Sequence, residues 1–210
     1  MKVSTQGKTL SDFPELVAEI NEKMHPNLDP SSIPAGGRKK LHWKCSKGPD
    51  HEWEANTWLR IVRKSGCPYC AGRKVSKTNS LQTINPKLAS EWHPTNNGEL
   101  TPDKILAGSG KKIWWKCSKG KDHEWEAVCK DRLGYKERKG SGCPYCAGRK
   151  PSVTNRLDLH FPKVASEWHP TKNGDLHASD VSFGTAKKVW WKCSKGPDHE
   201  WQTTVVSRTG

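Results

Sequence analysis

The sequence has few of the residues that normally form a protein core. Leu, Ile, Val and Phe account for 33 of the 210 residues, about 16%. A share below roughly 20%, combined with high net charge, is typical of disordered chains. No stretch reaches the roughly 18 consecutive apolar residues of a membrane span, and the N-terminus lacks the apolar segment of a secretory signal. These absences exclude a large aliphatic core, and we expect no contact with a membrane.

The residues that are present argue against disorder. The chain contains 11 Trp and 8 Cys, which polar disordered sequences do not collect. Because nothing indicates export, we expect a cytoplasmic protein, or a nuclear one in a eukaryotic cell, whose cysteines bind metal rather than form disulfides. The formal net charge of +14 points to a polyanionic partner, most commonly nucleic acid. The alternative is that the lysines only keep a poorly packed protein soluble.

The chain is built from a repeated unit. A segment with the pattern x-x-W-K-C-S-K-G-x-D-H-E-W occurs three times, and its copies begin at Leu41, Ile113 and Val189. The segment GCPYCAGRK occurs twice, from Gly66 and from Gly142. We predict three zinc modules over residues 10–74, 79–150 and 155–210, of which the third stops before its C-P-x-C knuckle. Because the third copy shows no decay, we expect the full-length protein to continue with a Gly-Cys-Pro-x-Cys segment.

The pattern within each unit predicts a small α+β fold. Pro86–Trp92 and Pro162–Trp168 begin with a proline, which the first helical position tolerates, and are expected as short helices. Alternation over Lys112–Cys117, and from His123 to about Cys129, predicts two strands joined into a hairpin. We expect disorder only in the first several residues and at the end of the third unit.

Each complete unit carries four potential metal ligands. The first has the spacing C-x5-H-x15-C-x2-C and the second C-x5-H-x19-C-x2-C. A C-x2-C turn places two thiolates on one ion, and four protein ligands leave no coordination position for a catalytic water, as in structural zinc sites. The alternative is that these cysteines are merely buried or disulfide-bonded. We predict two structural Zn²⁺ sites, formed by Cys45, His51, Cys67 and Cys70, and by Cys117, His123, Cys143 and Cys146.

The third unit supplies only half of such a site. Cys193 and His199 match the first two ligands of the other units, but no second cysteine pair follows them. The eighth cysteine, Cys129, aligns with Thr57 and Val205, which predicts a packing position rather than a ligand. Zinc would compensate for the missing aliphatic core, because its binding contributes roughly 10–16 kcal/mol in small zinc modules.

The tryptophans fall into two groups along the predicted hairpins. Trp43, Trp115 and Trp191 alternate in phase with the first ligand cysteine and are expected to point inward. Trp114 and Trp190, with His42 in the first unit, alternate outward. An outward aromatic ring can stack on an exposed base, or it can pack against the neighbouring unit. Both interpretations stay open for Trp114 and Trp190.

Basic residues also recur in register. Phosphate contacts use arginine as a bidentate donor and lysine as a point charge. Lys44, Lys116 and Lys192 are instead expected to pair across the hairpin with Glu52, Glu124 and Glu200. The predicted phosphate contacts are the pairs Lys39 and Lys40, Lys111 and Lys112, and Lys187 and Lys188; the arginines Arg60, Arg132 and Arg208; and the residues after the knuckles, Arg73, Lys74, Arg149 and Lys150.

One motif raises the question of catalysis. Glu91-Trp92-His93 and its copy at residues 167–169, each followed by an asparagine, could belong to a His/Asn nuclease finger. Neither motif has an Asp-His pair or a second set of metal ligands beside it. We therefore expect no enzyme activity in this chain.

Together these motifs resemble a known family. W-W-K-C, H-E-W, the following arginine, G-C-P-Y-C and the upstream E-W-H-P are similar to the tandem probable zinc-ribbon, treble-clef-like repeats of bacteria, plants and large DNA viruses. The resemblance covers the chain from about Phe13 onward. It implies the same eight zinc ligands, and it implies that an endonuclease-like domain can accompany such an array. Unit one departs from the pattern, with Ile20 where the other units have tryptophan.

We therefore expect tandem α+β zinc modules, each a short helix with a zinc-bound hairpin and a C-P-x-C knuckle. The favoured function is nucleic-acid binding, to DNA rather than RNA, as a targeting or accessory module of a larger protein. The alternative function is a protein–protein interaction scaffold.

Overall fold

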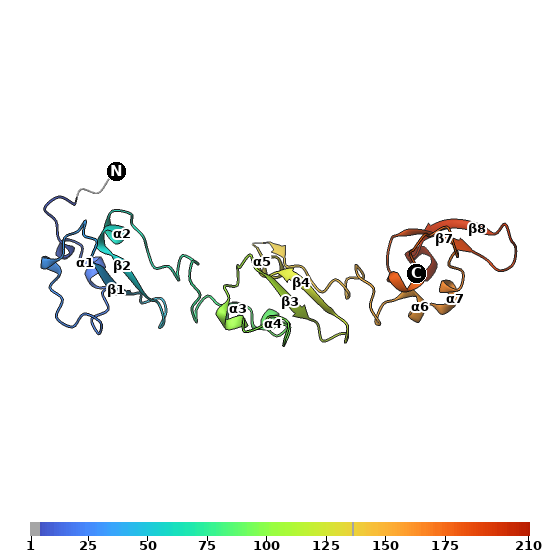
Figure 1. Cartoon of the computed structure of the whole chain (residues 1–210), viewed down its shortest axis with the longest axis horizontal. Helices are drawn as coiled ribbons and strands as arrows, with labels where there is room; N and C mark the ends of the chain where they lie inside the picture. Colours follow the sequence, from blue (N-terminus) through green and yellow to red (C-terminus); the bar gives the residue numbers. More distant parts are fainter. Residues whose placement is uncertain (1–4, 136) are drawn as a thin grey trace. The chain divides into compact units, whose positions relative to one another are not determined.

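The computed structural model describes residues 5–135 and 137–210. Its main elements are antiparallel two-stranded hairpins accompanied by helices of three to five residues (Figure 1). No helix in the described ranges is long and apolar enough to cross a membrane. By its contacts the chain divides into two compact units. One contains the chain up to Ser90 together with Gly98–Gly110, and the other contains Glu91–Asn97 and Lys111–Gly210.

The first unit opens with the elements of the first repeat. The short helices η1 (Leu10–Asp12), α1 (Pro14–Val17) and η2 (Pro30–Ser32) precede the hairpin β1 (Lys40–Lys44) and β2 (Glu52–Asn56), and helix α2 (Thr57–Ile61) follows it. Helices α3 (Leu81–Ile84), α4 (Pro86–Ala89) and η3 (Pro102–Lys104) complete the unit. Side-chain acceptors cap the starts of α2, α3 and α4, which helps helices this short to form.

The second unit repeats the hairpin twice. Strands β3 (Lys112–Lys116) and β4 (Glu124–Val128) lead into α5 (Cys129–Leu133) and a small hairpin of β5 (Gly134–Tyr135) and β6 (Arg138–Lys139). Helices α6 (Leu157–His160), α7 (Pro162–Ala165) and η4 (Ala178–Asp180) precede strands β7 (Lys188–Lys192) and β8 (Glu200–Thr204). The chain then forms α8 (Val206–Thr209), so the disorder predicted for the end of the third unit is wrong. The disorder predicted for the first residues falls on 1–4, outside the described residues.

The tandem α+β architecture confirms the predicted fold class, but the predicted helices are too long. Helix α4 ends at Ala89 rather than at Trp92, because the next residues pair with the hairpin instead. Glu91 accepts a hydrogen bond from Lys116 N at 2.7 Å, and Trp92 forms a β-bridge with Trp115. Repeat one makes the equivalent link with Ile20 in place of tryptophan, through a bridge to Trp43.

Each of the three long hairpins is held by a cross-strand pair of tryptophans. The registers place Trp43 opposite Trp53, Trp115 opposite Trp125 and Trp191 opposite Trp201. The first member of each pair is fully buried, and its indole N–H donates to a backbone oxygen of the partner strand, as Trp43 does to Ala55 at 2.8 Å. Aromatic rings therefore take the place that aliphatic side chains fill in most cores.

An arginine completes this tryptophan core. The Arg60 guanidinium carbon lies 4.8 Å from the Trp43 ring centroid and 5.2 Å from that of Trp53, and the guanidinium pairs with Glu19. Arg132 and Arg208 repeat the arrangement with the glutamates at positions 91 and 167. Arg60 and Arg132 are only 5% and 6% exposed. The prediction that this arginine contacts phosphate is wrong for Arg60 and Arg132, because their guanidinium groups are buried between tryptophans, and Arg208 occupies the same place in the third repeat.

Replacing this arginine should destabilise its repeat. We expect Arg132→Ala to lower the free energy of unfolding by about 3 kcal/mol, because it leaves Glu91 without its buried partner. The midpoint of urea unfolding of the zinc-loaded chain measures the effect. Lys130→Ala, at an exposed position of the same helix, is the matched control and should change stability by less than about 0.5 kcal/mol. If Arg132→Ala left the urea midpoint unchanged but weakened nucleic-acid binding, the burial account would be contradicted and Arg132 would be a phosphate contact.

Candidate metal centres

The hairpin end opposite α2 brings two potential ligands together. Cys45 directly follows β1 and His51 directly precedes β2. Cys45 N donates to His51 O at 3.0 Å, which extends the strand pairing by one step and places the two side chains next to each other. Gly48 is required in the turn between them, because a Cβ there would lie 2.5 Å from His51 Nε2. Gly120 and His123 have the same relation at 2.5 Å.

The knuckle supplies the other two ligands. Pro68 and Tyr69 separate Cys67 from Cys70, and the turn is closed by a hydrogen bond from Ala71 N to Cys67 O at 3.1 Å. Gly72 follows with φ of +64°, a backbone conformation in the left-handed region that favours glycine. Gly148 plays the same part in the second knuckle with φ of +65°.

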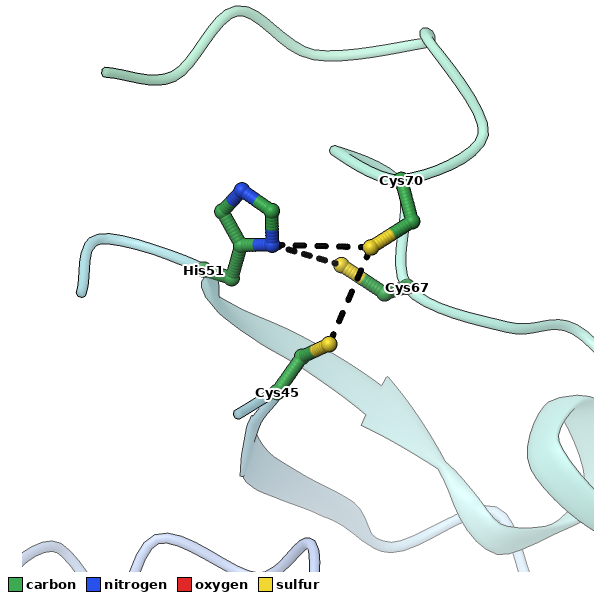
Figure 2. A group of neighbouring side chains, drawn as sticks. All are labelled: Cys45, His51, Cys67 and Cys70. Atoms are coloured by element: carbon green, nitrogen blue, oxygen red, sulfur yellow. Dashed lines mark hydrogen bonds between the residues drawn. The ribbon is translucent and has the colours of Figure 1, made fainter. Parts of the chain in front are cut away.

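In the first group the ligand atoms face one another. Figure 2 shows His51 Nδ1 directed toward the sulfurs of Cys67 and Cys70, at 3.7 and 3.6 Å, with Cys45 Sγ 3.7 Å from Cys70 Sγ. All four ligand atoms lie within 4.8 Å of one another. A tetrahedral zinc site with Zn–S bonds of about 2.3 Å has sulfur–sulfur edges of about 3.8 Å. The separations therefore fit one zinc ion at the centre of the group.

The second group has nearly identical dimensions. Cys143 Sγ and Cys146 Sγ each lie 3.6 Å from His123 Nδ1, and Cys117 Sγ lies 3.7 Å from Cys146 Sγ. The longer insertion before this knuckle, which contains the small β5–β6 hairpin, leaves the geometry unchanged. Two groups with three sulfurs and one imidazole nitrogen fit the predicted zinc sites.

A tyrosine from each knuckle covers the ligand imidazole. The rings of Tyr69 and His51 are stacked, with centroids 5.1 Å apart and planes at 14°, and the Tyr69 hydroxyl donates to Glu52 O at 2.7 Å. Tyr145 and His123 repeat this arrangement at 5.0 Å and 12°. The tyrosine thus ties the knuckle to the hairpin on the side of the imidazole.

Without a cation, two of the ligand thiols hold their protons tightly. Partial desolvation, together with hydrogen bonds from the neighbouring thiols, raises the pKa of Cys70 to about 11 and that of Cys146 to about 12. A thiol with such a raised pKa keeps its proton at neutral pH unless a positive charge replaces it. A zinc ion would reverse this by stabilising the thiolates, which are the form that binds metal.

The remaining two predicted ligands and the eighth cysteine lie elsewhere. Cys193 N donates to His199 O at 3.0 Å, so the third hairpin has the same end as the other two. Within the described ranges, these two residues belong to neither group of three or more potential ligands. Cys129 is fully buried, which raises the pKa of its thiol to about 11, and it also lies outside both groups.

The predicted nucleic-acid contacts differ in exposure: the basic residues named here are exposed, and the two tryptophans are half-buried. The lysine pairs at the starts of the long hairpins and the basic residues after the knuckles are exposed, namely Lys39, Lys40, Lys111, Lys112, Lys187, Lys188, Arg73, Lys74, Arg149 and Lys150. Trp114 and Trp190 are half-buried within their own repeats: Trp114 packs edge-on to His93, with ring centroids 6.3 Å apart, and Lys172 Nζ lies 4.6 Å from the Trp190 ring centroid. On the hairpins, Lys116 and Glu124 pair as predicted, at 2.7 Å.

The histidine of the E-W-H-P motif contributes to the fold. His93 is 5% exposed, and its Nδ1 accepts hydrogen bonds from Thr95 N at 3.3 Å and Asn96 N at 3.1 Å. Its Nε2 lies 3.2 Å from Glu124 Oε2. The Asn97 side chain accepts from Trp114 N at 2.9 Å and donates to Trp114 O at 2.9 Å. The motif thus fastens the loop after α4 to strand β3.

Comparison with known proteins agrees with this geometry. A family model described as a probable treble clef zinc finger domain matches the chain three times, over residues 16–73, 88–149 and 164–210. A comparison with curated proteins gives no match.

Proposed function

The chain belongs to the probable treble clef zinc finger family, and from this premise we propose that it is a nucleic-acid-binding array whose modules are stabilised by zinc. The observation that carries the proposal is the repeated exposure of basic residues at equivalent positions. A pair of exposed lysines, of which the second is the first residue of the strand, stands at the start of each of the three long hairpins, and an exposed Arg-Lys pair follows each knuckle. Of these lysines, Lys40 also pairs with Glu54 at 3.1 Å. The evenly spaced phosphates of a nucleic acid could contact basic residues that recur at equivalent positions of successive repeats.

The Arg-Lys pairs after the knuckles are next to rigid parts of the fold. Arg73 N donates to Pro68 O at 2.8 Å, which holds the backbone of this pair against the knuckle. Lys74 Nζ lies 6.0 Å from the Tyr69 ring centroid, and Lys150 Nζ lies 5.8 Å from that of Tyr145. A cation positioned on an ordered backbone binds phosphate at a lower entropic cost than one on a mobile loop.

Salt dependence tests this proposal. A chain with Arg73, Lys74, Arg149 and Lys150 replaced by alanine should lose about three to four units from the slope of log K against log salt on duplex DNA, at about 0.9 per phosphate contact. The control replaces four exposed lysines that have no lysine at the equivalent positions of the other repeats, and so has the same net charge: Lys8, Lys23, Lys104 and Lys121. An equal loss in both chains, or binding that does not respond to salt, would contradict a specific phosphate-binding role.

Duplex DNA, single-stranded DNA and RNA of equal length, compared in the same assay, identify the preferred polymer. We favour DNA, and we place the array as a targeting or accessory module of a larger protein, with an endonuclease-like domain as one such companion. The chain itself is proposed to be non-catalytic. Metal-dependent cleavage that disappears in the combined His93→Ala and His169→Ala chain would contradict this.

The third hairpin is proposed to be half of a further zinc site. Cys193 and His199 occupy the hairpin end as the ligands of the other repeats do, and a Cβ on Gly196 would lie 2.9 Å from His199 Nε2. A further C-x2-C knuckle would complete the tetrahedron.

One surface favours a second function, protein–protein interaction. Trp58 and Leu59 are neighbours on α2 of the first repeat, and each is 38% exposed. The Arg63 guanidinium carbon lies 5.6 Å from the Trp58 ring centroid. Tryptophan and arginine are the residues most enriched in protein interfaces. Capture of a protein partner that survives nuclease treatment and is lost with Trp58→Ala would favour the scaffold function.

A further inference from the structure

Each complete metal centre is followed at the same distance by the pattern Ser-x-Thr-Asn. It occupies Ser76–Asn79 after the first knuckle and Ser152–Asn155 after the second. Both segments, which we call the junctions, lie between the stretches matched by the zinc finger family model. One residue separates each of them from the first buried hydrophobic residue of the next repeat, Leu81 or Leu157.

The junction hydroxyls contact the ligand histidine on the side away from the sulfurs. His51 Nε2 lies 2.8 Å from Thr78 Oγ1 and 3.1 Å from Ser76 Oγ, while its Nδ1 faces the cysteines (Figure 2). A histidine that binds metal through Nδ1 carries its hydrogen on Nε2, so this N–H can donate to the hydroxyls. Such contacts fix the orientation of a ligand imidazole and strengthen it as a ligand.

The second centre has the same contacts. His123 Nε2 lies 2.8 Å from Thr154 Oγ1 and 3.0 Å from Ser152 Oγ. The two hydroxyls of each junction are also within hydrogen-bonding distance of each other, 3.0 Å in the first and 2.7 Å in the second. Ser76 and Ser152 are 5% and 2% exposed. Because the hydroxyls are buried and make the same contacts at both centres, they are a structural part of each centre rather than chance contacts of surface side chains.

The backbone of the junction is fastened to both halves of the metal centre. Asn79 accepts from Ser76 N at 2.8 Å and donates to the knuckle carbonyls of Tyr69, at 2.9 Å, and Lys74, at 3.0 Å. On the hairpin side, Asp50 accepts from Lys77 N at 2.7 Å. Asn155 and Asp122 make the corresponding bonds in the second junction.

The same segment then starts the next repeat. Ser80 caps α3 by accepting a hydrogen bond from Thr83 N at 3.3 Å. Leu81 N donates to Ile105 O at 2.9 Å. In the second junction Leu157 N donates to Val181 O at 3.0 Å. A metal centre and the first turn of the following repeat are therefore connected by a few consecutive hydrogen-bonded residues.

We propose that Ser76, Thr78, Ser152 and Thr154 are positioning residues of the zinc centres, and that zinc binding in one repeat orders the start of the next. The proposal requires zinc in the two groups but not nucleic-acid binding. Its physical basis is thermodynamic linkage through the ligand histidine. Zinc binding orders the imidazole and thereby favours the ordered state of the junction that contacts it, and an ordered junction in turn favours zinc binding.

Zinc affinity tests the positioning role. In chelator competition with the whole chain, Ser76→Ala with Thr78→Val should release one of its two zinc ions about 10- to 100-fold more readily, the usual cost of losing an outer-shell partner. The mirrored variant, Ser152→Ala with Thr154→Val, should weaken the other ion. Thr78→Ser keeps the hydroxyl and should retain the parent affinity. Equal affinity in the double variant, or equal weakening by Thr78→Ser, would overturn the positioning role.

Hydrogen exchange tests the coupling between repeats. In a chain with Cys67→Ser and Cys70→Ser, the amides of residues 76–81 should exchange at least about tenfold faster than in the parent chain, since their ordered state is no longer linked to zinc. The four ligands of the second centre are intact in this variant, so its zinc content reports that the second repeat still folds. Unchanged exchange at Leu81 would overturn the coupling. This result would be independent of any measurement with DNA.

Discussion

A chain carrying Cys67→Ser and Cys70→Ser should bind one zinc ion instead of two and lose the folded structure of its first repeat. The two thiols are half of the ligand set, and the remaining Cys45 and His51 cannot fill a tetrahedron. Zinc contributes roughly 10–16 kcal/mol in small modules, whereas a domain of ordinary size is stable by only about 5–15 kcal/mol in total. Loss of the ion is therefore expected to remove more stabilising free energy than the total free energy of unfolding of one repeat.

Two measurements check this expectation. Native mass spectrometry counts the bound zinc ions. The indole N–H signal of Trp43, which donates to Ala55 O at 2.8 Å in the folded hairpin, reports the structure of the first repeat in NMR spectra. Cys129→Val is the matched control, because that cysteine is buried outside both groups and aligns with Val205. It should keep two ions. A double-serine chain with two bound ions, or with an unchanged Trp43 signal, would contradict the assignment.

Zinc affinity should fall about a thousandfold for each unit by which the pH is lowered near neutrality, because three thiols per site must each release a proton. The affinity falls, rather than rises, as the pH is lowered because the pKa values of Cys70, about 11, and Cys146, about 12, are raised. A raised pKa means that the proton is held more tightly, so at neutral pH the ion must displace it.

Competition with a chelator at several pH values measures this slope. About three protons per zinc ion should be released near pH 7, which lies below both the ordinary thiol pKa of about 8.5 and the raised pKa values of Cys70 and Cys146. The Cys129→Val chain should give the same slope, because Cys129 is not a ligand even though burial raises the pKa of its thiol to about 11. A slope of one proton or less would mean that the thiols are not the ligands.

The metal centres could be predicted from the sequence because their chemistry is local and repeated. The C-x2-C turn and the short Cys–His hairpin fix ligand positions within a few residues, and two copies of the pattern occur. The strand boundaries of the second hairpin were also predicted to within one or two residues, since Ile113 and Trp115 alternate with less buried neighbours. Helix α4 was predicted too long, because the pairing of Glu91 and Trp92 with β3 is a tertiary contact that no helix signal contains.

The arginine position shows what the repeat pattern cannot distinguish. Arg60 and Arg132 recur in register exactly as a phosphate contact would, yet they are buried between tryptophans and paired with glutamate. The signal that could have identified them is the glutamate 41 residues upstream in each repeat, since two opposite charges recurring at one distance indicate a pair. The hydroxyls of Ser76 and Thr78 were missed although their pattern also recurs, because their contact with His51 depends on how the chain turns after the knuckle.

The zinc content of the intact chain tests the account most directly. Chain purified under reducing conditions, without added metal, should carry two zinc ions by native mass spectrometry, and each knuckle replaced by serines should remove one. A metal-free chain that is nevertheless folded, or one whose cysteines are found in disulfides, would contradict the central claim that zinc and tryptophan together replace the aliphatic core.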